Sequence, residues 1–244
     1  MSVLIGIVKS ALKRIGVDVK RMLPASNFGL QVARIVIDGG YDLVLDVGAN
    51  NGQFAHELRE FGYRGRIVSF EPLSAAHNRL SRAAARDPMW QVAPRGALGA
   101  ARSTTTINIS GLPASSSLLT MKRSHEDAAP GSASVGQEDV EVVALDDVAS
   151  VWLKDARRVF LKIDTQGFEL EVLKGAIGTL PRIEGALLEL SLVELYDGQP
   201  LWTEVIEWLR QHDFELVGLN QGFMEPTTYH TLQVDGIFKR QKGR

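Results

Sequence analysis

The segment Val44-Leu-Asp-Val-Gly-Ala-Asn-Asn-Gly52 decides the fold of this 244-residue chain. An apolar run ends at one glycine, and a second glycine precedes the helical stretch Gln53 to Phe61. Glycine on both sides of such a turn lets the backbone approach a ligand where a side chain would block it. The segment therefore predicts a buried strand, a tight ligand-binding turn and a helix.

The same strand and helix alternation continues along the chain. Three further strand-like runs each precede a helical pattern, and these pairs are Arg66 to Phe70 with Ser74 to Arg86, Val159 to Ile163 with Glu169 to Leu173, and Ile183 to Leu190 with Leu201 to Gln211. Strands that alternate with helices of this length form parallel βαβ units. The fold class is therefore α/β, a doubly wound, mostly parallel and Rossmann-like sheet.

The C-terminal part departs from this alternation. Phe214 to Leu219 and Thr231 to Phe238 read as strands joined by a loop too short for a crossover helix. Such strands pair as a hairpin, so we expect the sheet to close with an antiparallel C-terminal strand.

We place the main domain at residues 27–244, with one segment before it and one insert within it. Apolar residues at helical spacing between Leu4 and Ile15, with basic residues on the other side, predict an amphipathic helical appendage over residues 1–26. It would pack on the domain or on a second copy in a homo-oligomer, or it would touch a membrane surface. The Ser-, Ala-, Pro- and Gly-rich region at about residues 103–139 predicts a lid or insert.

Composition excludes several classes of function. The chain has 27 Lys and Arg against 29 Asp and Glu, and so lacks the basic excess typical of a nucleic-acid binder. It has no Cys, which excludes disulfides, thiol catalysis, Fe–S clusters and Cys-ligated zinc. No apolar run approaches the roughly 20 residues that span a bilayer, and the N-terminus is unlike a signal peptide, so we expect a cytoplasmic protein.

The glycine turn and its neighbours indicate a nucleotide-type cofactor. Glu71 ends the next strand 71 − 52 = 19 residues after Gly52, a distance typical of an acid that binds a ribose diol. Asp46 before the turn would repel a pyrophosphate but suits a cationic sulfonium and amino-acid group. The dinucleotide and Walker fingerprints are absent from the sequence, so S-adenosylmethionine is the leading cofactor. Ala97 and Leu98, after the expected third strand, are candidates to flank its adenine.

Five segments together resemble the FkbM-type S-adenosylmethionine-dependent methyltransferases over about Leu43 to Phe238. They are Val44 to Gln53, Ser69 to Pro72, Ser115 to Leu119, Leu161 to Ala176 and Val234 to Phe238, and the most specific part is Lys162-Ile-Asp-Thr-Gln-Gly-Phe-Glu169. The resemblance implies O-methylation, very often of a sugar hydroxyl on a glycolipid, polysaccharide or glycosylated natural product. Carried over by position, it implies that Asp46, Gly48, Asn50, Gly52 and Glu71 hold the cofactor, with Asp164 facing the methyl group. We add the adjacent Ala49 and Pro72 to the expected cofactor site.

Methylation of a sugar hydroxyl needs a base or a metal, because the hydroxyl is a very weak acid. Asp164 and Glu189 lie on strands that we expect to be neighbours, which allows a shared proton or a divalent cation such as Mg²⁺. The alternatives are that Asp164 caps a helix and that Glu189 pairs with a buried Lys or Arg. His125, in the predicted lid, is a third candidate base, although a loop histidine is more often solvated.

The loop after the fifth strand carries Glu194 and Tyr196, and rings beside carboxylates suit sugar recognition. We assign these residues, with Ser116 and Gln166, to the acceptor site; the alternative for the loop is a plain helix entry. Three other functions remain open: a non-catalytic cofactor-binding partner subunit, an N-methyltransferase of a small amine and, least favoured, a nicotinamide dehydrogenase.

Overall fold

Two adjacent buried strands, β1 (Leu43–Val47) and β7 (Val159–Ile163), form the middle of the sheet in the computed structural model, which describes residues 12–17 and 22–241. Every residue of both strands is buried, because helices cover both faces of the sheet. The remaining strands are β2 (Arg66–Phe70), β3 (Trp90–Val92), β8 (Ile183–Ser191), β9 (Phe214–Gln221) and β10 (Gln233–Arg240). The seven strands are ordered β3-β2-β1-β7-β8-β10-β9.

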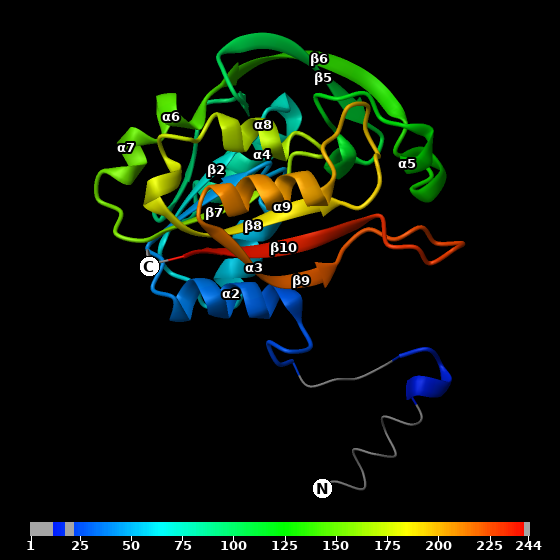
Figure 1. The fold of residues 1–244 in the computed structure, drawn as a ribbon, viewed down its shortest axis with the longest axis horizontal. Coiled ribbons are helices and arrows are strands. Elements are labelled where there is room, and N and C mark those ends of the chain that lie inside the picture. The colour runs from blue at the N-terminus through cyan, green and yellow to red at the C-terminus, as the bar shows by residue number, and fades with distance from the viewer. Residues whose placement is uncertain (1–11, 18–21, 242–244) are drawn as a thin grey trace, which may run out of the picture.

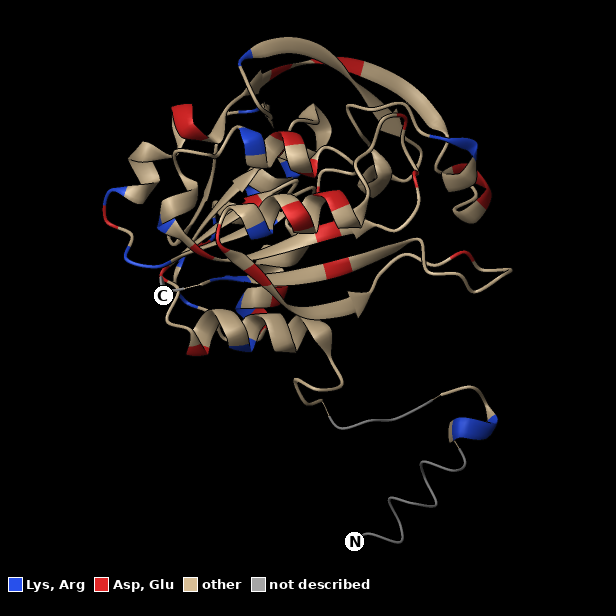
Figure 2. Cartoon of the chain, in the orientation of Figure 1, with Lys and Arg blue, Asp and Glu red and all other residues tan. Residues whose placement is uncertain are grey.

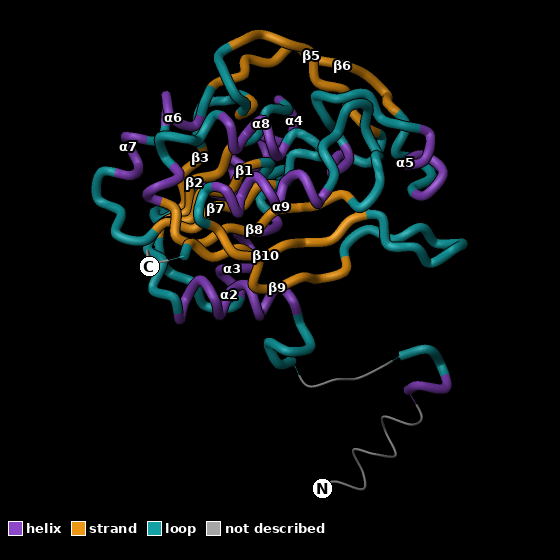
Figure 3. Tube along the Cα trace, in the orientation of Figure 1, coloured by secondary structure: helices purple, strands orange, loops and turns teal. Residues whose placement is uncertain are grey.

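The pairing directions confirm the predicted fold class. Strands β3, β2, β1, β7 and β8 run parallel to one another, whereas β10 is antiparallel to both β8 and β9. The C-terminal hairpin thus inserts β10 between β8 and β9 (Figure 3).

Helices lie on the two faces of this sheet (Figure 1). One face packs against α2 (Phe28–Asp38), α3 (Gln53–Glu60) and α4 (Ser74–Ala84). The other packs against α6 (Leu145–Val148), α7 (Ser150–Leu153), α8 (Glu169–Lys174) and α9 (Trp202–Gln211). Each cluster is built from alternate residues of the same strands, because successive strand side chains point to opposite faces.

The predicted lid is an ordered second sheet that arches over one end of the main sheet (Figure 1). Strands β5 (Ser103–Ser110) and β6 (Ser134–Val143) pair antiparallel, and the short β4 (Ala97–Leu98) pairs with β6. Between β5 and β6 lie the 3₁₀ turn η1 (Pro113–Ser115) and helix α5 (Arg123–Ala128). The sequence did not reveal β6, because six of its ten residues are solvent-exposed and polar or small residues interrupt the apolar pattern.

Two sets of hydrogen bonds attach this insert to the main domain. The Ser74 amide and hydroxyl donate to the two carboxylate oxygens of Glu138 on β6, at 2.6 and 2.7 Å. On the other side, Ser117 Oγ donates to the Gln166 carbonyl at 2.7 Å. The insert is therefore attached at both the β2 and the β7 sides of the sheet edge where parallel strands end.

The predicted N-terminal appendage falls largely outside the described residues, within which Leu12 to Arg14 are helical. In the part of the chain that is described, no helix combines the length and the apolar character required for a membrane crossing. Positively and negatively charged residues are interspersed along the chain of the described domain (Figure 2), as the nearly balanced composition predicts.

Candidate active site

The ends of β1, β2 and β7 open into a cavity of about 800 Å³. Helices α2 and α3 form one wall of this cavity, and η1 with the following residues forms another. Among the residues predicted to bind cofactor or acceptor, the cavity is lined by Gly48, Ala49, Asn50, Glu71, Pro72, Ala97, Leu98, Ser116, Asp164 and Gln166. Carboxyl ends of parallel strands are where α/β sheets bind ligands.

The glycine turn is sterically enforced at both ends. Gly48 has φ 73°, and a Cβ there would lie 1.8 Å from the carbonyl oxygen of Asp164. Gly52 has φ 89°, and its Cβ would lie 2.6 Å from the ring of Trp90. Gly52 does not line the cavity, so its role is to let α3 begin against Trp90 rather than to contact a cofactor.

Glu71 holds the turn from the neighbouring strand. Its carboxylate accepts the Asn50 amide at 2.7 Å and the Leu73 amide at 2.9 Å. Burial raises the pKa of Glu71 to about 7, although these two amide donors act in the opposite direction. The carboxyl group lines the cavity and retains acceptor capacity for a ligand hydroxyl.

Asp46 occupies a different place from the one that the sequence predicts. It is fully buried and does not line the cavity. Its carboxylate accepts Ser69 Oγ at 3.0 Å and lies 3.4 Å from Lys162 Nζ. The prediction that Asp46 faces a cationic cofactor group is therefore wrong in this arrangement, because its charge is directed to a lysine inside the protein.

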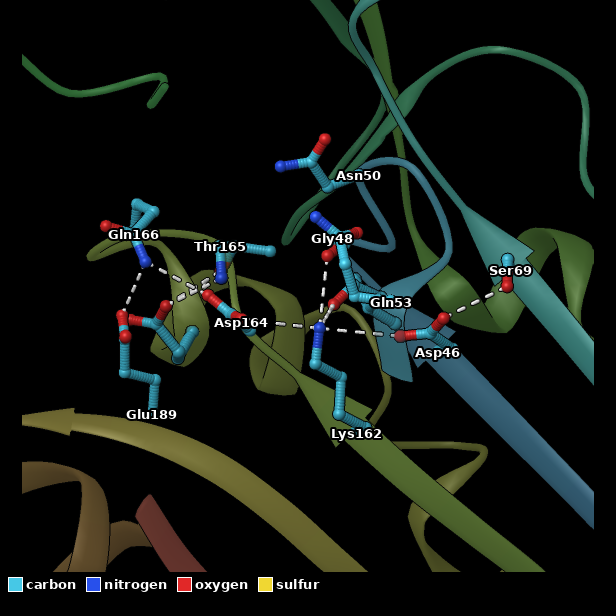
Figure 4. A network of polar contacts seen from close by, with 12 residues as sticks. Asp46, Gly48, Asn50, Gln53, Ser69, Lys162, Asp164, Thr165, Gln166 and Glu189 are labelled. Atoms are coloured by element: carbon cyan, nitrogen blue, oxygen red, sulfur yellow. Dashed lines mark hydrogen bonds and ion pairs between the residues drawn. The ribbon is translucent and has the colours of Figure 1, made fainter. Parts of the chain in front are cut away.

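Lys162 joins the two central strands and the turn (Figure 4). Its Nζ lies 3.4 Å from Asp46 Oδ1 and 3.4 Å from Asp164 Oδ2, and it donates to the Gly48 carbonyl at 3.0 Å. Burial alone would lower the pKa of this ammonium, but the two carboxylates outweigh that effect and hold the pKa above its ordinary value. The sequence does contain a signal for this ion pair, because a lysine within the apolar run Val159 to Ile163 needs an anionic partner.

Asp164 and Glu189 lie side by side, as predicted, because Ile163 and Leu188 are partners in the β7–β8 ladder. A single amide bridges them: Gln166 Nε2 donates to Asp164 Oδ1 at 3.0 Å and to Glu189 Oε2 at 2.7 Å (Figure 4). Gln233 Nε2 also donates to Glu189 Oε2, at 2.7 Å. The partners of Glu189 are therefore two amides, and the alternative of a pair with Lys or Arg is wrong.

The two carboxyl groups differ in their surroundings. Burial raises the pKa of Glu189 well above its ordinary value, and the negative charge of Asp164 is the second largest cause. Both effects favour the uncharged acid. Asp164, in contrast, faces the cavity beside the Lys162 ammonium. Within residues 12–17 and 22–241, no group of three or more His, Asp or Glu residues is arranged to hold a metal ion.

Asp164 does not cap the following helix. The amides of Thr165 and Gly167 instead donate to Glu169 Oε1, at 2.8 and 3.1 Å. Because Glu169 satisfies the amides of this turn, the Asp164 carboxylate remains available to the cavity.

Besides Asp46, Gly52 and Glu189, three further predicted residues lie away from the cavity lining. His125 is buried, contacts the rings of Tyr196 and Phe223, and its Nδ1 lies 3.1 Å from Ser132 Oγ. Burial lowers its pKa, and it does not reach the cavity, so this arrangement gives it a packing role and not that of a base. Glu194 pairs with Lys122 at 2.6 Å, and Tyr196 is fully buried, so neither forms part of the cavity surface.

Comparison with known proteins identifies the family of this chain. The sequence model described as the methyltransferase FkbM domain matches residues 46–216, more than half of the chain. The chain belongs to the FkbM methyltransferase family.

Relatives of this FkbM-family chain are distant. It is 29% identical over 153 residues to methyltransferase sdnD of Sordaria araneosa, a match that covers 54% of this chain and 59% of that protein. An uncharacterized protein of Listeria monocytogenes serotype 4b has a similar fold, with a TM-score of 0.50, 8% identity, and coverage of 91% of this chain and 70% of the other. A structure titled as a putative RNA methyltransferase from Pyrococcus horikoshii aligns with a TM-score of 0.47, 12% identity, and coverage of 88% and 82%.

The cavity of this FkbM domain fits S-adenosylmethionine at several points. Asn50 Oδ1 is buried without a hydrogen-bond partner among the described residues, so it is an acceptor that lacks a donor. Glu71 offers a carboxyl group, and Ala97 with Leu98 offers an apolar surface for a base. These residues would hold the amino or hydroxyl groups and the adenine of the cofactor.

Replacement of Lys162 tests its structural role. In Lys162→Met the Asp46 carboxylate loses its counter-charge, and we expect the free energy of unfolding to fall by about 3–5 kcal/mol. The deficit should narrow as pH falls, because a protonated Asp46 needs no counter-charge. Chemical denaturation at several pH values measures both effects.

Lys174→Met is the matched control, because Lys174 pairs with Glu171 on the exposed surface of α8. It should cost at most about 1 kcal/mol. Equal losses in the two variants would contradict the role given to Lys162.

Proposed function

We propose that this protein is an S-adenosylmethionine-dependent O-methyltransferase that acts on a hydroxyl group of a sugar or glycoconjugate. The observation that carries the proposal is one cavity that holds the glycine turn and Glu71 at one end and the Lys162-paired Asp164 beside them. Membership of the FkbM family supports the cofactor and the reaction class.

The chain's own residues supply alignment and proton removal. When bound, S-adenosylmethionine provides a methyl group on a positively charged sulfur, whose carbon–sulfur bond breaks as the carbon–oxygen bond forms. Asp164 lies where it can accept the proton that the acceptor hydroxyl loses. The Lys162 ammonium balances the negative charge of the Asp164 carboxylate. Gly48 and Glu71 fix the backbone turn against which the cofactor would be aligned.

The rest of the cavity suits a hydroxyl-rich acceptor. Phe28 and Phe54 from α2 and α3, with Leu187 from β8, supply apolar surface, and Asp235 from β10 supplies a carboxyl group. Rings that cover C–H faces beside acids that accept hydroxyl groups are typical of sugar sites. The acceptor would be a glycolipid, a polysaccharide or a glycosylated natural product.

One observation favours an amine as a second kind of acceptor. Glu57 and Glu60 on α3 line the same cavity, and no ion pair with a described residue neutralises either of them. Burial, followed by the charge of Glu60, raises the pKa of Glu57. A cationic group would relieve that repulsion, so N-methylation of an amine is the alternative reaction.

Calorimetry with S-adenosylhomocysteine tests the cofactor site. If ribose hydroxyls donate to the ionised Glu71, protonation of this acid removes the binding-competent form. With a pKa of about 7, affinity should be about fivefold weaker at pH 6 than at pH 7. Binding near pH 7 should also release about half a proton per ligand bound, which the buffer dependence of the enthalpy reports.

In Glu71→Gln the affinity should be weak and independent of pH. No binding at millimolar concentration to the native protein would reject the cofactor site, and a pH-independent affinity would reject the role of Glu71.

Transfer of a labelled methyl group tests the reaction. The protein is incubated with labelled S-adenosylmethionine and a panel of glycosides, with small amines as a parallel panel. Asp164→Asn should bind the cofactor normally but lose at least about 100-fold in turnover, because the proton acceptor is removed.

Glu189→Gln is the matched variant, because an amide can imitate the uncharged acid and still accept from Gln166 and Gln233. It should keep turnover within about threefold, since the hydrogen bonds are conserved. Full activity in Asp164→Asn, or its loss in Glu189→Gln alone, would overturn the assignment of roles.

A further inference from the structure

The Gln166 side chain has an unusual position among the polar groups of the site. It lies at the turn between β7 and α8, where Gln166 adopts φ 55°, in the left-handed region that few non-glycine residues occupy. Its amide nitrogen reaches both carboxyl groups, and its amide oxygen lies 2.9 Å from Tyr196 Oη. All three polar contacts of this amide are therefore used inside the protein.

These contacts require one orientation of the amide. Two carboxyl oxygens need donors, so the NH₂ end must face Asp164 and Glu189 and the oxygen must face Tyr196. The single hydroxyl proton of Tyr196 is shared between that oxygen at 2.9 Å and the Ser115 carbonyl at 3.0 Å. Without the hydroxyl, the amide oxygen would lose its donor, and the two acids alone would hold the amide in this orientation.

Tyr196 is itself held firmly enough to set this orientation. Its side chain is fully buried, and its backbone amide donates to Gln199 Oε1 at 3.3 Å. Gln199 Nε2 in turn donates to Ser191 Oγ at 2.6 Å, and Gln233 Nε2 contacts the same hydroxyl at 3.3 Å. These hydrogen bonds link Tyr196 back to Glu189, because Gln233 Nε2 also donates to the Glu189 carboxyl group.

The same residues attach the cavity wall to the turn. Tyr196 Oη lies 3.0 Å from the Ser115 carbonyl, and Ser117 Oγ donates to the Gln166 carbonyl at 2.7 Å. Ser116 and Ser117 line the cavity opposite the strand ends. The position of the insert and the orientation of the Gln166 amide are therefore set by shared contacts.

We propose that Gln166 and Tyr196 are positioning residues: the Tyr196 hydroxyl fixes the Gln166 amide, and that amide aims the Asp164 carboxylate into the cavity. The consequence for turnover rests on the proposed function of Asp164 as the proton acceptor. The orientation of the amide does not depend on that function, so the orientation and the effect on turnover can be tested separately. Gln166 and Tyr196, which the sequence placed in the acceptor site, thus act through Asp164 instead of binding the acceptor.

The first test reads the Gln166 amide directly, in the full-length protein labelled with ¹⁵N. Its side-chain NH₂ signals are assigned by their loss in Gln166→Met. We expect the native signals to exchange slowly with solvent, because both donors are bound within the protein. Tyr196→Phe should raise their exchange rate by about tenfold or more, or split them between two orientations, since one hydrogen bond is lost.

Tyr63→Phe is the matched control. Tyr63 is also buried, and its hydroxyl donates to the Arg66 carbonyl at 3.2 Å at the opposite end of β2. This variant should leave the Gln166 signals unchanged. Unchanged signals in Tyr196→Phe would overturn the proposal whatever the protein catalyses.

The second test uses the acceptor that the glycoside or amine panel identifies. Tyr196→Phe should lower kcat by about tenfold while KM and the affinity for S-adenosylhomocysteine stay the same. In a Gln166→Met background the Tyr196 change should cost much less, because the amide through which the hydroxyl acts on Asp164 is absent. Additive losses would show an independent role and contradict the proposal.

The outcomes separate the two hypotheses. If no acceptor is methylated, the proposed function fails, while the exchange measurement still decides the orientation of Gln166. If Tyr196→Phe does not fold, Gln166→Met carries the kinetic test: native-like kcat would overturn the proposal, and a selective loss of kcat with normal cofactor affinity would support it.

Discussion

The Lys162 ammonium is the interaction on which the rest of this site depends. It lies between Asp46 at the core of β1 and Asp164 just beyond β7, and it also binds the carbonyl of Gly48. Because Asp46 and Lys162 are direct partners in the β1–β7 ladder, the ion pair is part of the central strand register. A slip by one residue would bury two unpaired charges at a cost of several kcal/mol each, so the pair fixes strand register and cavity geometry together.

This cation also explains how acids can crowd one strand edge. Asp164 directly follows β7, and Glu189 and Asp235 are ladder partners on the adjacent strands β8 and β10. When several carboxyl groups lie this close together, repulsion between their charges favours protonation of at least one of them. Lys162 compensates Asp164, while the raised pKa of Glu189 allows that acid to be neutral and to serve as a hydrogen-bonding partner for two amides. As a result, Asp164 faces the cavity as a carboxylate paired with an ammonium group.

Local patterns in the sequence predicted the backbone of the site well. Glycine spacing located the turn at Gly48, the strand and helix alternation gave a mostly parallel sheet, and Glu71 lies at the cavity as expected. These features depend on short-range periodicity and on the rule that parallel strands end at one edge. The segment from Lys162 to Glu169 resembles a family motif, and this resemblance marked the place of Asp164 in the site.

The errors concern where side chains point. Asp46 precedes the turn in sequence, yet strand alternation directs it into the protein toward Lys162 and away from the ligand. His125 and Tyr196 pack against each other, a contact between segments about seventy residues apart that no local pattern encodes. The bridging role of Gln166 depends on a left-handed backbone conformation, which sequence periodicity does not reveal.

A crystal structure with S-adenosylhomocysteine bound would test this arrangement of the site. The ribose hydroxyls should contact Glu71, and the sulfur, from which the methyl group has departed, should face Asp164 while Lys162 remains between Asp46 and Asp164. A ligand with its sulfur turned away from Asp164, or bound outside this cavity, would show that Asp164 is not the proton acceptor or that the cavity is not the cofactor site.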